Sequence, residues 1–408
     1  MTEPAPPKPL DRVSQVEFIF MIAALMALNA LAIDVMLPAL GEILADYGLP
    51  PGNMQQWVVI AYVLGFGAPQ LIYGPLCDAF GRRPVLLASL VGYTAISLLC
   101  LVAPSFGILL ALRAVQGAFA AGCRVGAVSM VRDLFEGRAM ARIMSFVLTI
   151  FMVVPVLAPG LGEIVLWLTG HWTGPFWVLV LVGGIMLAWV GIRMPETLAE
   201  ENRRTLDLKS SFEGYLQVLS YPVTRGYLIA SGIIFGGLFA FIASAEQIFK
   251  DVFGIDVLFT VCFAFVAAAL GVTNLLNARL VEKFGMRPIS HGALVAYTAL
   301  SSLLLILLLS VGQAIWIFLP LFAMIFGLFG LMGANFSALA MEPLGKIAGS
   351  GAAAYGFITS TLSMILGLAI GQQFNETVYP ITIGMLVLGV ATLLTVWITD
   401  RAKMFKAR

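Results

Sequence analysis

Apolar runs of about twenty residues follow one another along almost the whole 408-residue chain, and they constrain its fold more than any other feature. A helix needs about 20 apolar residues to cross the hydrocarbon core of a bilayer. Only 11% of the residues are charged, whereas a soluble domain carries about a quarter, so lipid must cover most of the surface. We therefore predict an all-α membrane protein with twelve transmembrane helices near residues 17–39, 54–74, 84–103, 106–130, 140–166, 174–193, 224–246, 257–279, 289–311, 314–340, 351–373 and 377–399.

The distribution of basic residues predicts the orientation of these spans. An even number of spans places both ends of the chain on one side of the membrane. Most of the 23 lysines and arginines lie in the two tails and in the loops on that side, whereas the loops on the other side hold only Lys250. Because basic loops stay inside the cell, we expect both termini in the cytoplasm. The proline-rich start of the chain is expected to be a cytoplasmic tail, not a cleaved signal peptide.

The chain also contains an internal repeat. The loop GPLCDAFGRRP at residues 74–84 returns as ARLVEKFGMRP at residues 278–288, half the chain later. Two homologous halves with a site between them are common among secondary transporters. The predicted domains are a cytoplasmic tail at 1–16, a six-helix bundle at 17–193, a cytoplasmic linker at 194–222, a second six-helix bundle at 223–400 and a tail at 401–408.

Several motifs resemble those of the major facilitator superfamily, in particular its twelve-span drug/proton antiporter group. The loop at residues 74–84 resembles the hallmark loop between spans 2 and 3, and Arg113, Gln116 and Gly117 fit the span-4 motif. Closer resemblance to the bicyclomycin and chloramphenicol resistance (Bcr/CflA) subfamily comes from residues 31–38 (LAIDVMLP), 132–135 (RDLF), 144–162 and 195–197 (PET). The sequence departs from these patterns at Ala79, Glu246 and Arg124.

The resemblance implies a fold and a function. The fold would be two pseudo-symmetric bundles of six helices. The function would be proton-coupled export of small amphipathic compounds, such as chloramphenicol-like or bicyclomycin-like drugs, by alternating access in a bacterial inner membrane. The partners would then be a small-molecule substrate, protons and the lipid bilayer, with the chain acting as a monomer. A narrow-substrate carrier for a metabolite or a siderophore is the alternative.

Asp34 and Arg113 are the candidates for proton coupling. An ionisable group in an otherwise apolar span is costly and is a functional candidate by default. A carboxyl whose proton affinity changes with its exposure can bind a proton on one side and release it on the other. Arg113 lies at a similar depth and is the natural partner of Asp34, and Gly117 leaves room for a neighbouring helix. The alternatives are a permanently paired carboxylate at Asp34 and a hydrogen-bonded strut at Arg113.

Other polar residues in the spans are candidates for substrate binding. Most such groups form hydrogen bonds between helices, and some could contact a substrate. Glu246 is either solvated at a helix end or a second acidic site for a cationic drug. Arg124 is expected to snorkel to the lipid headgroups, with an anion-attracting cavity as the alternative. The predicted substrate-binding residues are Asn29, Asp34, Gln116, Glu246, Asn274 and Asn335.

A third set of residues is expected to control conformation. The glycines and the closing proline of residues 74–84 permit a tight turn, and the carboxylate of Asp78 can accept hydrogen bonds from a helix N-terminus. The arginines can pair with acids, and the resemblance implies that these contacts close the cytoplasmic side. The prolines of residues 140–166, together with Gly160 and Gly162, predict a bend and a close helix contact. These candidates are Gly74, Asp78, Gly81, Arg82, Arg83, Pro155 and Pro159.

The sequence offers little to other classes of function. It has two histidines, and it has neither a nucleotide-binding loop nor the spacing of a metal site, so we expect no enzyme, no cofactor and no metal. The net charge of +1 gives no reason to expect nucleic acid.

Overall fold

The computed structural model describes residues 13–135, 137–203, 205–255, 258–400 and 405. Every regular element in that part of the chain is a helix. The elements are α1 (Gln15–Asp34), η1 (Leu37–Ala39), α2 (Leu40–Asp46), η2 (Asn53–Gln56), α3 (Trp57–Gly67), α4 (Gln70–Phe80), α5 (Arg82–Cys100), α6 (Phe106–Leu134), α7 (Gly137–Thr169), α8 (Gly174–Arg193), η3 (Glu200–Asn202), α9 (Leu208–Ser220), α10 (Pro222–Gln247), η4 (Ile248–Val252), α11 (Phe259–Phe284), α12 (Met286–Val311), α13 (Ile315–Met341), η5 (Gly345–Ile347), α14 (Ala348–Gly371) and α15 (Tyr379–Thr399).

The predicted all-α membrane fold is confirmed. In the described part of the chain, ten helices are long and apolar enough to cross a membrane, and the bent pair α3 and α4 makes an eleventh span. The span predicted at 140–166 coincides with α7, in which Val153–Thr169 forms a shorter apolar helix. The 44° bend between α3 and α4 falls at Pro69, which has no N–H to continue the helix.

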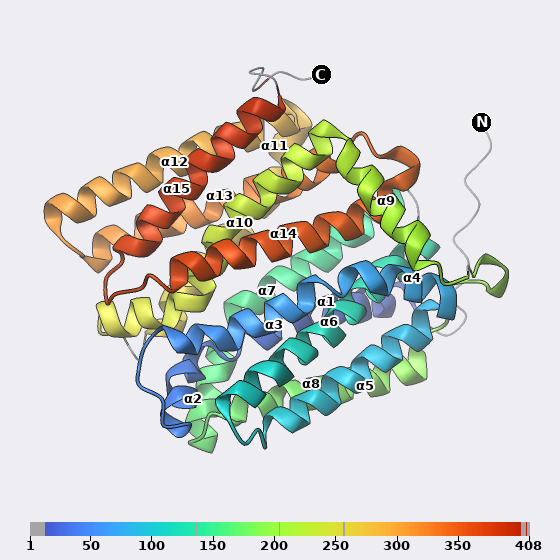
Figure 1. Cartoon of the computed structure of the whole chain (residues 1–408), viewed down its shortest axis with the longest axis horizontal. Coiled ribbons are helices and arrows are strands. Elements are labelled where there is room, and N and C mark those ends of the chain that lie inside the picture. Colours follow the sequence, from blue (N-terminus) through green and yellow to red (C-terminus); the bar gives the residue numbers. More distant parts are fainter. Residues whose placement is uncertain (1–12, 136, 204, 256–257, 401–404, 406–408) are drawn as a thin grey trace.

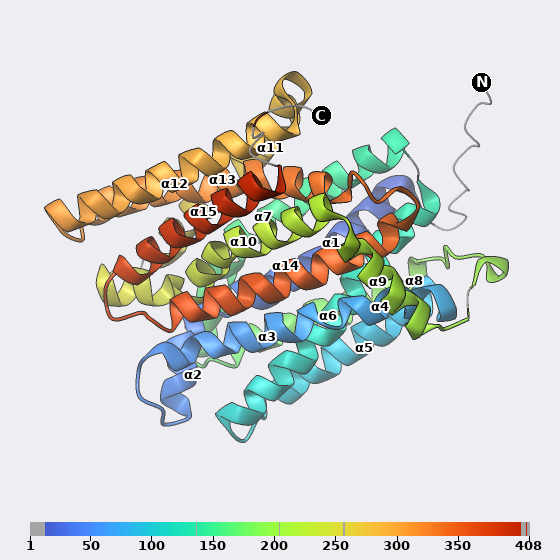
Figure 2. The same cartoon turned by 45° about the horizontal axis from the view of Figure 1, so that its top comes forward.

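The helices lie side by side in an oblique stack (Figure 1). Helices α1 to α8 gather on one side of it and α10 to α15 on the other, as the turned view in Figure 2 also shows. The two groups meet where α14 packs against α3 and where α11 packs against α7. Below, "first half" means residues 13–193 and "second half" residues 205–400. The predicted domain boundaries stay a prediction.

Successive spans run in opposite directions, so their ends form two faces. One face, here the terminal face, carries the start of α1, the end of α15 and the linker helix α9. The other, here the opposite face, carries α2, η2 and η4. The repeated loops lie on the terminal face, and each turns at a single glycine. Gly81 has φ 98° and Gly285 has φ 83°, values that favour glycine, so the turns of the two repeats are built alike.

The position of Gly74 corrects one expectation. Gly74 lies inside α4 and takes no part in the turn, because the helix continues to Phe80. It is followed by Pro75, which cannot donate to the carbonyl of Leu71 four residues earlier. The hydroxyl of Tyr215 in α9 donates to that carbonyl at 2.7 Å. The linker predicted at 194–222 therefore contains a helix. This helix is hydrogen-bonded to the first half through the Leu71 carbonyl, which Pro75 leaves without a donor inside α4.

Candidate functional site

The first span is interrupted at its acidic residue. Helix α1 ends at Asp34, and the chain continues through η1 into α2 within one apolar span of 32 residues. The side chain of Asp34 is only 3% exposed, and it forms no ion pair with any residue that the structure describes. Interrupted helices inside a membrane occur where backbone and side-chain groups line a binding site. The break and the buried carboxylate therefore mark one candidate site.

Helix α7 packs directly against this break. A Cβ on Gly162 would lie 2.2 Å from the carbonyl oxygen of Val35, so only glycine allows the two backbones to approach this closely. Pro155 and Pro159 both lie inside α7, about two turns and one turn before this contact respectively, and Pro159 is buried. The predicted close helix contact is confirmed, whereas the predicted bend stays a prediction. The glycine and proline motif of residues 155–162 thus places α7 beside Asp34.

Arg113 is completely buried among neutral acceptors. Its Nε donates to the carbonyl of Val58 at 3.1 Å, its Nη2 to the carbonyl of Ala32 at 2.9 Å and its Nη1 to Oε1 of Gln116 at 2.6 Å. The guanidinium carbon lies 4.5 Å from the ring centroid of Tyr62, a cation–π contact. These contacts spread the charge over dipoles from three helices.

The expected ion pair between Arg113 and Asp34 is not found in the described chain. Arg113 binds α1 at the carbonyl of Ala32, two residues before Asp34. Successive residues of a helix are rotated by about 100°, so Ala32 and Asp34 lie on different sides of α1. The predicted contact of Gly117 is present, since a Cβ there would lie 1.9 Å from the carbonyl oxygen of Tyr62. Arg113 thus ties α6 to α1 and α3 without neutralising Asp34.

Gln116, Asn335 and Asn29, which are predicted to bind substrate, form hydrogen bonds within the protein. The amide nitrogen of Gln116 donates to Ser97 Oγ at 2.7 Å, so both ends of this fully buried side chain are engaged. The amide of Asn335 donates to Asn277 Oδ1 at 2.7 Å between α13 and α11. Asn29 is half-buried and accepts a hydrogen bond from the Tyr62 hydroxyl at 3.2 Å. Gln116 and Asn335 therefore hold helices together in this arrangement.

Asn274 and Arg124 lie at less enclosed positions. Asn274 is half-buried on α11, and its backbone nitrogen would lie 2.7 Å from a Cβ on Gly330 of α13. Arg124 is half-buried on α6, with its guanidinium carbon 5.7 Å from the ring centroid of Phe66. This contact holds the arginine against α3.

Polar side chains from both halves interlock at the opposite face. Gln56 donates to Gln247 Oε1 at 2.8 Å and to the carbonyl of Gly371 at 2.9 Å. Asn53 accepts from Gln247 at 3.2 Å and exchanges hydrogen bonds of 2.9 Å with Gln372. Asn53 and Gln56 belong to the first half and the other three to the second. This amide cluster therefore joins the two halves at the opposite face through neutral groups.

Glu246 lies beside the amide cluster. It is 5% exposed, pairs with Lys250 at 3.0 Å and accepts from Gln55 of the first half at 3.4 Å. Its expected solvation at a helix end is wrong, because α10 continues into η4 and the first half covers its carboxylate. Whether it binds substrate stays a prediction.

At the terminal face, the arginines of residues 74–84 bind within the first half. Arg82 pairs with Asp78 at 2.5 Å and with Asp133 at 3.0 Å, as expected for pairing with acids. Arg83 instead donates to the carbonyl of Gly191 at 2.6 Å. Asp78 binds Arg82 and not a helix N-terminus, which corrects that expectation.

The N-terminus of α5 is bound by Glu196. Its carboxylate accepts from the backbone nitrogens of Arg82 at 3.0 Å and Arg83 at 3.2 Å. The same carboxylate would lie 2.5 Å from a Cβ on Gly81, so any larger residue in the turn would have to displace the carboxylate from its place. A negative group at this position satisfies free N–H groups and interacts favourably with the helix dipole.

Glu196→Ala is expected to lower the free energy of unfolding by about 1–2 kcal/mol, the range seen when a helix loses its N-terminal cap. Thermal unfolding of the detergent-solubilised protein measures this change. Glu196→Gln keeps one oxygen acceptor and should recover part of the loss. Glu200→Ala, on an exposed side chain of the same linker, is the matched control. Equal melting temperatures for Glu196→Ala and Glu200→Ala would contradict the capping role.

The sequence did not single out the amide cluster or the role of Glu196. Asparagine and glutamine at helix ends are common, and their pairing depends on the packing of segments about 190 and 320 residues apart. Glu196 stands out in the sequence only as part of residues 195–197. The placement of Lys250, the sole base among the loops of its side, could have indicated its partner Glu246, since an isolated cation needs an acid nearby.

Comparison with known proteins agrees with this architecture. The family model described as Major Facilitator Superfamily matches residues 22–368 of this chain. The bicyclomycin resistance protein homolog of Haemophilus influenzae is 30% identical over 370 residues, which cover 90% of this chain and 92% of that protein. The chloramphenicol resistance protein of Pseudomonas aeruginosa is 28% identical over 283 residues, covering 67% of this chain and 64% of that protein.

The fold itself also matches solved structures. The structure of a D-xylose-proton symporter superposes with a TM-score of 0.73 at 14% identity, covering 97% of this chain and all of that one. The match to the family model spans most of the chain, and the Haemophilus influenzae protein matches this chain along nearly the whole length of both. The chain therefore belongs to the Major Facilitator Superfamily, whose members carry small molecules across membranes.

Proposed function

We propose that this protein is a proton-coupled antiporter that exports small amphipathic compounds of the chloramphenicol or bicyclomycin type. The observation that carries the proposal is Asp34, a buried carboxyl without an ion-pair partner among the described residues, at a helix break inside the first span. Such a group can hold a proton in one conformation and release it in another. The resistance named for the two bacterial relatives supports the class of substrate.

The proposed orientation follows from the charges. The terminal face carries the basic loops and would lie in the cytoplasm of a bacterial cell, with the protein in the inner membrane. The opposite face would then be closed to the outside in this conformation. Its amide cluster suits a gate, because amide groups that separate on opening can form hydrogen bonds to water instead. The chain would work as a monomer, and its substrates would cross unchanged.

Transport into vesicles tests this function. The purified protein is reconstituted in liposomes with an acidic lumen, and radiolabelled chloramphenicol and bicyclomycin are added outside. We expect both to accumulate in the lumen, because protons leaving through inside-out molecules drive substrate inward. Chloramphenicol carries no charge, so a pH gradient alone does not concentrate it.

Two controls define the result. Nigericin, which collapses the pH gradient, should abolish accumulation, and protein-free liposomes should show none. Absence of transport for both drugs, together with gradient-driven transport of a metabolite or siderophore, would replace drug export by the narrow-substrate alternative. Accumulation that persists with nigericin would disprove proton coupling.

A further inference from the structure

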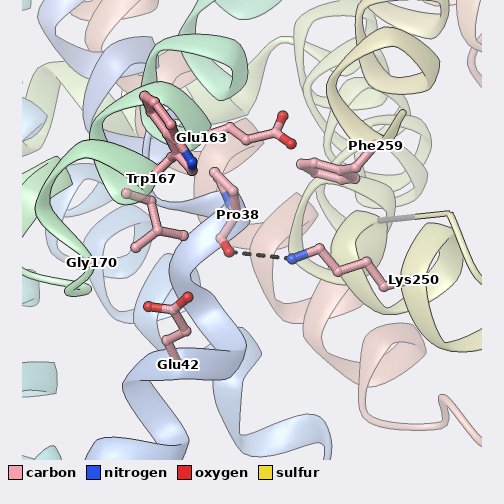
Figure 3. A pocket seen from close by; sticks show the side chains of 8 residues that line it. Pro38, Glu42, Glu163, Trp167, Gly170, Lys250 and Phe259 are labelled. Atoms are coloured by element: carbon pink, nitrogen blue, oxygen red, sulfur yellow. Dashed lines mark hydrogen bonds between the residues drawn. The ribbon is translucent and has the colours of Figure 1, made fainter. Parts of the chain in front are cut away.

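A pocket of about 450 Å³ opens on the opposite face at the boundary between the two halves (Figure 3). Its first-half walls include Pro38, Glu42, Glu163 and Trp167, and its second-half walls are Lys250 and Phe259. A pocket of this size falls in the range that accommodates small organic ligands. It is separate from Asp34 and from the amide cluster.

The pocket already contains one alkylammonium group, that of Lys250. Its Nζ lies 3.0 Å from Glu246 Oε1 and 3.4 Å from the carbonyl oxygen of Pro38, the contact drawn in Figure 3. The same nitrogen lies 5.9 Å from the ring centroid of Phe259. A carboxylate, a carbonyl and an aromatic ring are the groups that bind ammonium ions in proteins. The lining is thus suited to cations.

The lining contains more negative charge than Lys250 neutralises. Figure 3 shows the carboxylates of Glu42 and Glu163 on either side of the pocket. Neither forms an ion pair within the described ranges, and Glu163 accepts only the hydroxyl of Thr260. Because Lys250 is already paired with Glu246, the charges of Glu42 and Glu163 are left without a counter-ion among the lining residues. Charges enclosed by low-dielectric walls concentrate the potential and attract ions of the other sign.

An apolar surface lies beside these carboxylates. Trp167 is 81% exposed and lines the pocket from α7. An indole ring is the strongest cation–π partner among the side chains, and it also binds apolar groups. The unpaired carboxylates and the indole ring together would best bind a ligand that has a fixed positive charge next to an apolar group.

We propose that this pocket binds a small organic ammonium ion, with its charge between Glu42 and Glu163 and its apolar part on Trp167. The site requires neither proton coupling nor a particular direction of transport.

Binding of benzyltrimethylammonium to the purified protein, measured by isothermal titration calorimetry, tests the proposal. We expect saturable binding that weakens about fivefold in Glu42→Gln and in Glu163→Gln, since an exposed ion pair contributes up to about 1 kcal/mol. Lys250→Met should bind the cation more tightly, because it frees Glu246 and removes a competing charge. An anion site would show the opposite changes.

Matched controls separate charge from shape. Glu376→Gln changes an exposed carboxylate in another loop of the same face and should leave binding unchanged. Neopentylbenzene has the shape of the probe without its charge and should not bind. Binding of the probe at Trp167 should also change the tryptophan fluorescence of the protein. Trp167→Phe should reduce both this fluorescence change and the affinity for the probe. Equal binding by wild type, Glu42→Gln and Glu163→Gln, or no binding at all, would overturn the proposal.

The ammonium group can come from a free cation or from a phosphatidylethanolamine headgroup. Titration in nanodiscs of phosphatidylglycerol alone and of a mixture with phosphatidylethanolamine distinguishes these sources. A weaker apparent affinity in the mixture identifies the lipid headgroup as a competing ligand. An unchanged affinity identifies the free cation as the ligand. Either result supports an ammonium site, provided that the carboxylate variants behave as expected.

Discussion

Asp34→Asn is expected to abolish pH-driven accumulation of chloramphenicol, reducing it to the level of protein-free vesicles. The amide has nearly the shape of the carboxyl but cannot take up and release a proton. Because Asp34 has no ion-pair partner in the described chain, its replacement should leave the packing of the break largely unchanged. The vesicle assay described above measures the loss, and drug binding to the purified variant should remain.

An exposed acid provides the matched control for this variant. Glu201→Gln, on the terminal face, should transport like wild type. Gradient-driven transport that survives Asp34→Asn would place the proton site elsewhere. Glu246, buried between the halves, would then be the next carboxylate to replace. Loss of drug binding together with transport would instead assign Asp34 to the substrate.

Gly117→Ala is expected to destabilise the folded protein by about 1–3 kcal/mol, the cost of overpacking a close contact. The added Cβ would lie 1.9 Å from the carbonyl oxygen of Tyr62 and 2.9 Å from the nitrogen of Phe66, so α3 and α6 must separate. The same separation loosens the hydrogen bond from Arg113 to Val58. We therefore expect the melting temperature of the protein and its rate of transport in vesicles to decrease together.

Helix α6 supplies its own control. A Cβ on Gly107, near the start of this helix, would meet no atom within 4 Å. Gly107→Ala should be neutral or slightly stabilising, because alanine loses less backbone entropy than glycine in a helix. A melting temperature of Gly117→Ala equal to that of Gly107→Ala would show that the helices relax around the new methyl group without cost.

The axial positions of the spans could be predicted from the sequence, because the length of an apolar run sets where a helix crosses the bilayer. The repeated turns could be predicted for a similar reason, since Gly81 and Gly285 occupy equivalent positions in similar segments. The contact of Gly117 followed from its small size in an apolar helix. These features depend on local properties of the chain.

The partners of charged residues could not be predicted in the same way. Arg113 and Asp34 lie at similar depths, yet pairing also depends on how each helix is rotated about its axis. The arginine binds the carbonyl of Ala32, and an apolar sequence gives no signal for a backbone acceptor. The same difficulty applies to the N-terminus of α5, which either Asp78 or Glu196 could have bound. The structure places Glu196 there and pairs Asp78 with the Arg82 side chain.

The bond between Tyr215 and Leu71 limits how the two halves can move. Helix α9 packs mainly against α14 and α10, with Val218 buried in a cluster with Leu228 and Leu344. It ends at Ser220 and α10 begins at Pro222, so we expect it to move together with the second half. Any rocking of the second half away from α4 must therefore break the hydrogen bond from Tyr215 to Leu71. A single proline in α4 thus creates the contact that has to be released when the terminal face opens.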